Sequence, residues 1–316
     1  MILVVGGTSF LGRSLLTQLR EYSYPLRILL EPAASSPSLP AGLSFEAALS
    51  SLQDERGIRA AMVGVDTILH VGGASLGIGT GDPSEAQGRG AETLVAMARE
   101  AGARRIIYVS QLGADQASAY PLLQANARVE EAVQHSGLDY TILRSSVLFG
   151  EGDALTTGMA QLIAASPLFF FLPGDGQTTL QPLWVEDLAT CVLWSLDLEE
   201  TIGNVYSVGG PEYFTLEDIV RMIMSTAAML RIVVKTRPPY LRFATRIIQR
   251  ILPRPPVNSH WIDYLAVSRT TDLNTLPRVF GLAPSRMEDR IDYLRAKNWG
   301  WVFLRNQFRR RRLACQ

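Results

Sequence analysis

The sequence predicts an α/β fold in which a doubly wound parallel sheet is followed by a smaller, mainly helical C-terminal lobe. Short apolar runs alternate with helix-period segments through the first half of the 316 residues. Repeated βα units of this kind form parallel sheets with helices on both faces. Near Pro211 the alternation stops. We therefore expect a sheet domain over residues 1–210, a helical lobe over 211–298 and an aromatic, basic tail over 299–316.

The expected strands are short apolar runs, most of them followed by glycine or polar residues. They cover residues 2–5, 26–30, 43–47, 67–71, 105–110 and 140–143. Helical spacing places helices between them, over residues 53–63, 85–101 and 125–136. In the lobe, Thr215 and the acidic residues after it predict a helix start. A threonine side chain caps free amides there, and acidic groups suit the positive end of the helix dipole.

The most informative stretch is Gly-Gly-Thr-Ser-Phe-Leu-Gly at residues 6–12, between the first strand and an apolar-periodic helix. In such a corner, the free amides and the positive dipole end of the helix face a pyrophosphate. Ser9 departs from the G-x-x-G-x-x-G pattern. Its Cβ would reduce affinity, whereas its hydroxyl could donate a hydrogen bond to the phosphate. A tight turn without a ligand is the alternative. The expected contacts are Gly6, Thr8, Ser9, Phe10, Leu11 and Gly12.

Glu31 ends the second expected strand, 19 residues after Gly12. An acidic residue near this distance suits a ribose 2′-hydroxyl and repels a 2′-phosphate. The sequence therefore favours NAD(H) over NADP(H) as the cofactor. The alternative is a solvated strand end before Pro32.

Further cofactor contacts are expected at the carboxyl ends of the other strands, because ligands of open parallel sheets bind outside those ends. The candidates are Val71, Gly72, Gly73, Ser110 and Ser145.

Composition excludes several classes of function. A formal net charge of zero argues against a nucleic-acid binder driven by overall charge. Cys191 and Cys315 are far apart and form no metal-ligand spacing, so we expect a reducing, cytoplasmic setting and no metal site. The longest apolar runs are too short to span a bilayer.

With these motifs, the chain resembles an atypical short-chain dehydrogenase/reductase of the NAD-dependent epimerase/dehydratase-like kind. The resemblance rests on residues 6–12, 65–73, 107–114, 138–150 and 181–189. Residues 252–256 and 280–284 are similar to the branch that holds the Rossmann-type accessory subunit of respiratory complex I. The resemblance implies an NAD(P)-binding Rossmann domain and, for this branch, a structural or assembly role rather than turnover.

Active members of the family use a tyrosine as acid/base and a lysine four residues later, which lowers the tyrosine pKa and holds the nicotinamide ribose. The resemblance places Leu122 at the tyrosine position and Asn126 at the lysine position. A nearby register pairs Tyr120 with the uncharged Gln124. Because the first 234 residues contain no lysine, the dyad is absent, and we expect a catalytically weak or inactive protein.

Two alternatives stay open. In the first, the protein is an active NAD(P)-dependent oxidoreductase or epimerase that uses Tyr120 as an unusual acid/base, with Arg128 as its electrostatic partner. In the second, the fold is kept but the ligand is lost, which leaves a pure interaction protein. His70, at a strand end, is expected to be a packed strand histidine rather than a catalyst.

The tail from Trp299 to Arg312 combines large apolar side chains with four consecutive arginines. Such a segment suits an anionic membrane surface or the acidic face of a protein partner; a disordered, solubilising end is the alternative. The leading hypothesis is an NAD(H)-binding accessory or assembly subunit of a membrane-associated electron-transfer complex, peripheral on the cytoplasmic face of the membrane. The tail's large apolar residues are Trp299, Trp301, Phe303, Leu304 and Phe308.

Overall fold

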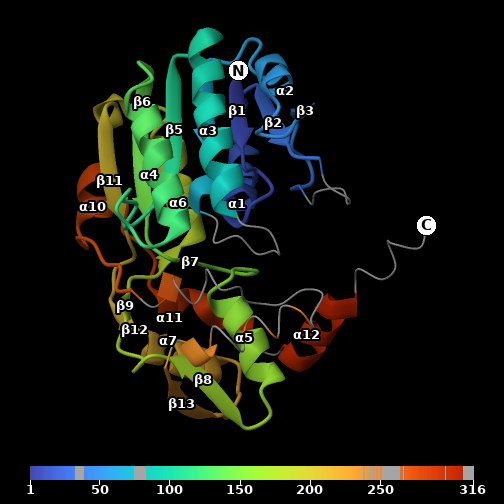
Figure 1. The fold of residues 1–316 in the computed structure, drawn as a ribbon, viewed down its shortest axis with the longest axis vertical. Helices are drawn as coiled ribbons and strands as arrows, with labels where there is room; N and C mark the ends of the chain where they lie inside the picture. Colours follow the sequence, from blue (N-terminus) through green and yellow to red (C-terminus); the bar gives the residue numbers. More distant parts are fainter. Residues whose placement is uncertain are drawn as a thin grey trace.

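The protein consists of a sheet domain and a lower lobe, drawn above and below in Figure 1. The computed structural model describes residues 1–32, 39–74, 83–237, 239–241, 245, 247, 250, 264–265, 267–295 and 297–308. The carboxyl ends of the central strands point toward the lower lobe (Figure 1).

The central sheet has seven parallel strands in the order β11-β6-β5-β4-β1-β2-β3. The chain builds β1 to β3 in one direction, then returns and places β4 on the other side of β1. The boundary between β1 and β4 is therefore a topological switch point, where ligands of such sheets bind. This confirms the predicted fold class. The strands are β1 (Ile2–Val5), β2 (Leu26–Leu30), β3 (Glu46–Leu49), β4 (Thr67–His70), β5 (Arg105–Gln111), β6 (Asp139–Ser145) and β11 (Asn204–Val208).

Helices cover both faces of the sheet, and each face has its own hydrophobic core. On one face α1 packs against α6; on the other α3 packs against α2 and α4. Because both faces are covered, every residue of β1, β4 and β5 is buried, which explains the apolar residues at the centre of each strand. The helices are α1 (Phe10–Leu19), α2 (Glu55–Ala61), α3 (Pro83–Glu100), α4 (Pro121–Gln134) and α6 (Val185–Trp194), with the short η1 (Gly72–Ala74) after β4.

Two elements begin elsewhere than predicted. The third strand starts at Glu46 rather than at residue 43, because Leu43 and Phe45 pack against the core before the strand begins. β3 is mostly exposed, so its apolar pattern is weak. α4 starts at Pro121, four residues before the expected start, since proline is well suited to a first helical turn.

The lower lobe has a third core, which draws residues from both sides of the expected boundary at residue 210. Thr215 caps α7 in a capping box with Asp218, as its sequence position predicts. Besides its helices, the lobe contains three short strand pairs, β7–β10, β8–β13 and β9–β12. The lobe elements are β7 (Leu148–Phe149), α5 (Thr156–Ala165), β8 (Phe169–Pro173), β9 (Thr179–Leu180), β10 (Leu183–Trp184), β12 (Phe214–Thr215), α7 (Leu216–Thr226), β13 (Ile232–Thr236), α11 (Met287–Arg290), η3 (Ile291–Leu294) and α12 (Trp299–Phe308).

Two further elements belong to the sheet domain. η2 (Glu199–Thr201) precedes β11, and α10 (Thr275–Phe280) packs against β11. Leu276 and Phe280 belong to the core shared with α1 and α6. The sheet domain therefore contains residues from far beyond position 210.

The expected tail is a docked helix over its first ten residues, which corrects one part of the prediction. Trp299 is buried in the lobe core, where its Nε1 donates to the Leu294 carbonyl at 3.0 Å, so it is not available to a membrane or a partner. Trp301 and Leu304 are exposed. The arginines at 309–312 and the Phe308 side chain lie outside the described residues. Among the described helices, none has the length and apolar character needed to cross a bilayer.

Candidate functional site

The glycine corner lies at the carboxyl end of β1, against the start of η1. Gly6 has a φ of +83°, and a Cβ there would lie 2.8 Å from the Gly72 nitrogen. A Cβ on Gly12 would lie 2.1 Å from the Gly6 carbonyl oxygen. Glycine is therefore required at both positions by the fold itself, and the turn brings the β1 and β4 ends into contact at the switch point.

Ser9 is the N-cap of α1. Its Oγ accepts a hydrogen bond from the Gly12 amide at 3.0 Å, and its carbonyl accepts from Arg13 at 3.0 Å. The first amides of a helix have no acceptor within the helix, so those of Phe10 and Leu11 stay available at the positive dipole end. This donor set fits a pyrophosphate. The Ser9 hydroxyl keeps its own proton for donation, whereas its acceptor function serves the cap.

The wall opposite the corner is built on close backbone contacts at the end of β4. Val71 is buried, and its amide donates to the Val5 carbonyl at 3.0 Å. A Cβ on Gly73 would lie 2.4 Å from the Val109 carbonyl oxygen and 2.6 Å from the Tyr108 hydroxyl. Gly73 is therefore required so that η1 can lie directly against β5.

Asn126, at the position that the resemblance assigns to the lysine, is turned into the protein. The Tyr108 hydroxyl donates to Asn126 Oδ1 at 2.6 Å, and both side chains are buried. Burial raises the pKa of Tyr108, so its phenol stays protonated. Neighbouring Gln111 donates from Nε2 to the Gly73 carbonyl at 3.0 Å. The Tyr108, Asn126 and Gln111 side chains are thus bonded within the protein, and all three are uncharged.

Tyr108 and Gln111 have roles that sequence reasoning missed. Both lie in a strand that is buried throughout, and a polar residue in such a strand needs a partner. This requirement is the signal that could have marked them. Their partners, Asn126 and Gly73, come from α4 and η1, which the sequence does not place in contact.

Ser110 and Ser145 are buried at the ends of β5 and β6. The Ser145 hydroxyl donates to the Ser146 carbonyl at 2.8 Å, and the Ser145 carbonyl accepts from Leu112 at 2.9 Å. The structure thus places them at the expected edge of the sheet but turns their side chains inward, and their contact with a cofactor stays a prediction.

Glu31 and Thr8 are exposed. Glu31 directly follows β2, and Leu29 of that strand pairs in register with Val5. The carboxylate therefore lies at the same edge as Gly6, one strand away. This is where a ribose bound at the glycine corner would extend, and the contact itself stays a prediction.

Tyr120 and Arg128 are not neighbours, which corrects the pairing considered for an unusual acid/base. Tyr120 is the N-cap residue of α4 and is half-buried. Arg128 lies eight residues further along, roughly 12 Å of helix, and its Nε is 3.9 Å from a carboxylate oxygen of Glu92. Leu122 is buried. No cation stands beside Tyr120 among the interactions of the described residues.

His70 is a packed strand residue, as expected. Burial lowers its pKa to about 4 because the low-dielectric interior disfavours the imidazolium. Its ring lies 5.2 Å from that of Tyr108, and Nδ1 accepts from the Gly72 amide at 3.4 Å. The neutral histidine therefore supports η1 rather than reacting with a substrate.

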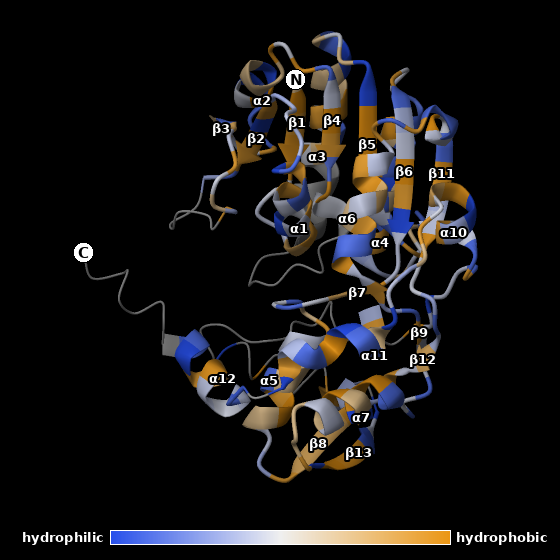
Figure 2. Cartoon of the chain, turned by 180° about the vertical axis from the view of Figure 1, so that it is seen from behind, coloured by the Kyte–Doolittle hydropathy of each residue, from blue (hydrophilic) through white to orange (hydrophobic). Residues whose placement is uncertain are grey.

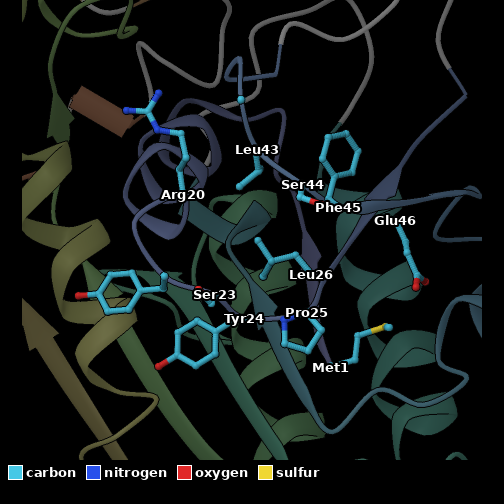
Figure 3. A pocket seen from close by; sticks show the side chains of 12 residues that line it. Met1, Arg20, Ser23, Tyr24, Pro25, Leu26, Leu43, Ser44, Phe45 and Glu46 are labelled. Carbon is cyan, nitrogen blue, oxygen red and sulfur yellow. The ribbon is translucent and has the colours of Figure 1, made fainter.

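Of two cavities among the described residues, the first lies away from the glycine corner, and the second is lined in part by Phe10 of the corner. One of about 560 Å³ is lined by Met1, Tyr24, Pro25 and Leu26 among others, and Figure 3 shows these side chains around it. It lies at the amino ends of β1 and β2, the edge opposite the glycine corner. The other, about 590 Å³, lies between α1 and the lobe, against Trp184 and Tyr293. The described residues contain no cluster of His, Cys, Asp or Glu able to hold a metal.

Comparison with known proteins agrees with the glycine corner. Residues 6–165, which include the corner, η1 and α4, match the family described as NAD(P)H-binding. The chain belongs to this NAD(P)H-binding family.

Two curated relatives and one solved structure are similar to the chain. The chain is 30% identical over 231 residues to NADH dehydrogenase [ubiquinone] 1 alpha subcomplex subunit 9, mitochondrial, of Arabidopsis thaliana. The aligned region covers 70% of this chain and 56% of that protein. It is 25% identical to photosystem II assembly factor Ycf39 of Cyanophora paradoxa, over 70% of this chain and 67% of that one. An NADPH-dependent quinone oxidoreductase of Escherichia coli, solved with NADPH, shares the fold at a TM-score of 0.71 and 18% identity, covering 93% and 99% of the two chains.

The chain spans about half the length of the first two curated relatives, 56% of the Arabidopsis protein and 48% of its Dictyostelium discoideum namesake. Subunits of NADH dehydrogenase [ubiquinone] and a photosystem II assembly factor thus stand among the relatives, beside an NAD(P)H azoreductase of Xenophilus azovorans.

Proposed function

We propose that this protein binds NAD(H) as a structural or sensing ligand and acts as an accessory or assembly subunit of a membrane-associated electron-transfer complex, without turning over a substrate. The observation that carries the proposal is the Tyr108–Asn126 hydrogen bond. Through this bond Asn126, at the position of the lysine that active relatives would need, is tied to Tyr108. The amides of the glycine corner, in contrast, stay available for a pyrophosphate. The names of the relatives support the accessory role.

The proposed cofactor site has two parts. The amides of Phe10 and Leu11, with the Ser9 hydroxyl, would hold the pyrophosphate, and Glu31 would accept from the ribose hydroxyls. When bound, a nicotinamide dinucleotide supplies a hydride donor or acceptor. Of the described residues at this end, Leu122 at the tyrosine position is apolar, and the Tyr108 phenol is buried and donates to Asn126.

Native mass spectrometry of gently isolated protein tests binding. We expect one dinucleotide per chain, with the mass of NAD(H) rather than NADP(H). In parallel, NADH oxidation is followed in the presence of quinones, dyes and carbonyl compounds, and no rate above the protein-free background is expected. Turnover at about 1 s⁻¹ or faster, within the range of ordinary enzymes, would show that the protein is an enzyme. Isolation without any bound dinucleotide, together with no binding in titration, would leave a pure interaction protein.

The accessory role is tested by affinity purification of the full chain from mild detergent extracts. We expect it to co-purify in a fixed ratio with subunits of one membrane complex. Recovery of the protein alone, under conditions that keep such complexes intact, would contradict the role.

A further inference from the structure

Strands β8 and β13 form a two-stranded parallel ribbon at the end of the lobe farthest from the central sheet (Figure 1). They pair in register from Ile232 beside Phe169 to Thr236 beside Pro173. Parallel strands occur almost only with both faces covered. In this ribbon, the inner face is covered by the lobe core, which contains Phe170 and Leu172.

The outer face of the ribbon is apolar and exposed. Side chains alternate along a strand, so Phe169 and Phe171 point away from the core, on the same side as Ile232. Together with the residues that precede each strand, they form the exposed tip, which Figure 2 shows in hydrophobic colours. An exposed cluster of this kind marks an interaction surface. Its members are Leu168 (52% exposed), Phe169 (44%), Phe171 (51%), Leu230 (92%) and Ile232 (54%).

Charge is distributed unequally between the two ends of the chain. Residues 211–316 contain 19 Lys and Arg against 8 Asp and Glu, a formal charge of +11, whereas residues 1–210 contain 11 against 22, a formal charge of −11. Next to the exposed tip, Arg231 stands between Leu230 and Ile232, and Arg237 is exposed. Lys235, which pairs with the inward-facing Leu172, is ion-paired with Glu217 at 3.1 Å. Arg231 and Arg237 therefore supply positive charge beside the apolar tip.

The exposed apolar side chains and the neighbouring basic residues together indicate which kind of partner binds the ribbon's outer face. A second copy would bring two lobes of equal positive charge together. An anionic bilayer offers an apolar interior for the phenylalanines and negative headgroups for the basic residues, at about 1 kcal/mol per nearby Lys or Arg. The negative sheet domain would be repelled from the same surface, which orients the protein.

We propose that the outer face of the β8–β13 ribbon docks on an anionic lipid bilayer, with Phe169 and Phe171 entering the headgroup region. The proposal rests on the proposed membrane-associated role and assigns it to a surface different from the arginine-rich end. α12 of the same lobe presents Trp301, with Arg305 stacked 5.1 Å from its ring, as a second exposed aromatic group.

The test is co-sedimentation of the full chain with vesicles of phosphatidylcholine alone or with phosphatidylserine added. The wild type is expected to bind only the anionic vesicles and to be released by about 1 M salt, which screens the headgroup attraction. The double variant Phe169→Gln with Phe171→Gln is expected to weaken binding about tenfold, because the apolar surface of two aromatic rings is no longer transferred from water to the bilayer. The matched control, Leu49→Gln with Val63→Gln, changes two apolar residues of the sheet domain that are more exposed than the two phenylalanines, and it should bind as the wild type does.

Thermal unfolding and NADH binding, measured on each variant, report whether the fold and the nucleotide site are intact. The proposal is overturned if the ribbon variant binds as tightly as the control, or if deletion of residues 309–316 alone abolishes binding. Binding to native membranes but not to protein-free vesicles would identify a protein partner instead and also overturn it. Dinucleotide binding and co-purification with a complex, without vesicle binding, would overturn this inference and leave the proposed function standing.

Discussion

Phe10 occupies the first position of α1, where proline is tolerated because no helical hydrogen bond is lost. Ser9, before it, has an extended backbone (φ −67°, ψ 171°) that also suits a residue preceding proline. Phe10→Pro therefore removes one amide donor from the glycine corner and leaves the helix in place. Compared with Phe10→Ala, which removes the same ring but keeps the amide, we expect about tenfold weaker NADH binding by calorimetry. Equal affinities would show that this amide does not contact the ligand.

Glu31 determines the proposed preference between the two dinucleotides. A carboxylate at the end of β2 accepts from a ribose hydroxyl and repels a 2′-phosphate. We expect the wild type to bind NADH at least about tenfold more tightly than NADPH, and Glu31→Gln to reduce that ratio. Fluorescence titration measures both affinities. Glu21→Gln removes the same charge from the exposed end of α1 and should leave the ratio unchanged.

The bonded side chains at the nicotinamide end of the site predict that a dinucleotide is held mainly by its ADP-ribose half. Asn126 Oδ1 accepts from Tyr108, and Gln111 Nε2 donates to the Gly73 carbonyl, so these two atoms are already bonded within the protein. We expect ADP-ribose to bind within about threefold of NAD⁺, a difference smaller than one ordinary hydrogen bond. Competition titration against NADH decides this. If NAD⁺ bound tenfold more tightly than ADP-ribose, the nicotinamide would have contacts that this proposal lacks.

At the residue scale, the glycine corner could be predicted because Gly6 and Gly12 obey local rules of backbone geometry. The closed nicotinamide end could not be predicted from the residues alone. Its key distance joins Tyr108 in a strand to Asn126 in a helix, and this distance depends on how α4 packs on the sheet. The burial of Trp299 escaped prediction for the same reason, since an apolar residue near a basic run suits a lobe core equally well.

Asp153, at the start of α5, is expected to make the lobe's stability depend on pH. Burial raises its pKa to about 6, although Thr156 and Thr157 donate to the carboxylate. Because the folded-state pKa lies above the unfolded value of 3.8, the contribution to stability is complete below about pH 3.8 and is lost as the pH rises through about 6.

Asp153→Asn removes this titration. Relative to the wild type, its free energy of unfolding should rise by about 2 kcal/mol between pH 4 and 6, as measured by chemical denaturation. Asp54→Asn, at the exposed N-cap of α2, controls for the loss of a capping carboxylate. Parallel pH profiles for Asp153→Asn and the wild type would show that Asp153 does not titrate in this range.

At the element scale, the central strands could be predicted because burial on both faces produces uninterrupted apolar runs. The edge strand β3 was displaced in the prediction because it is mostly exposed, whereas the preceding Leu43 and Phe45 are partly buried against the core. Strand pairs such as β7–β10 and β9–β12 contain two residues per strand, too few for any periodicity to appear.

At the scale of the whole molecule, the sheet domain depends on residues far along the chain. Phe280 is buried, and its ring lies 6.0 Å from that of Tyr206 in β11. Asp187 of α6 accepts from the Ser285 amide at 2.6 Å. These contacts join the end of the sheet domain to a segment that follows most of the lobe.

We therefore expect Phe280→Ala to destabilise the whole protein by about 3–5 kcal/mol and to lower the melting temperature by about 5 °C or more in calorimetry. Phe171→Ala, at a half-exposed phenylalanine of the lobe, should cost much less. A similar loss for both variants would show that α10 contributes no more to the core than a surface contact does.

The position of α10 also has a consequence for biosynthesis. A ribosome that has released residue 210 has made every strand of the central sheet, yet the surface that receives Leu276 and Phe280 stays open until roughly seventy more residues have emerged. During that interval a nascent chain displays apolar surface beside β11, which is the kind of surface that chaperones bind. Chaperones that bind the chain late in translation should thus influence the yield of folded protein more than chaperones that bind the first βα units.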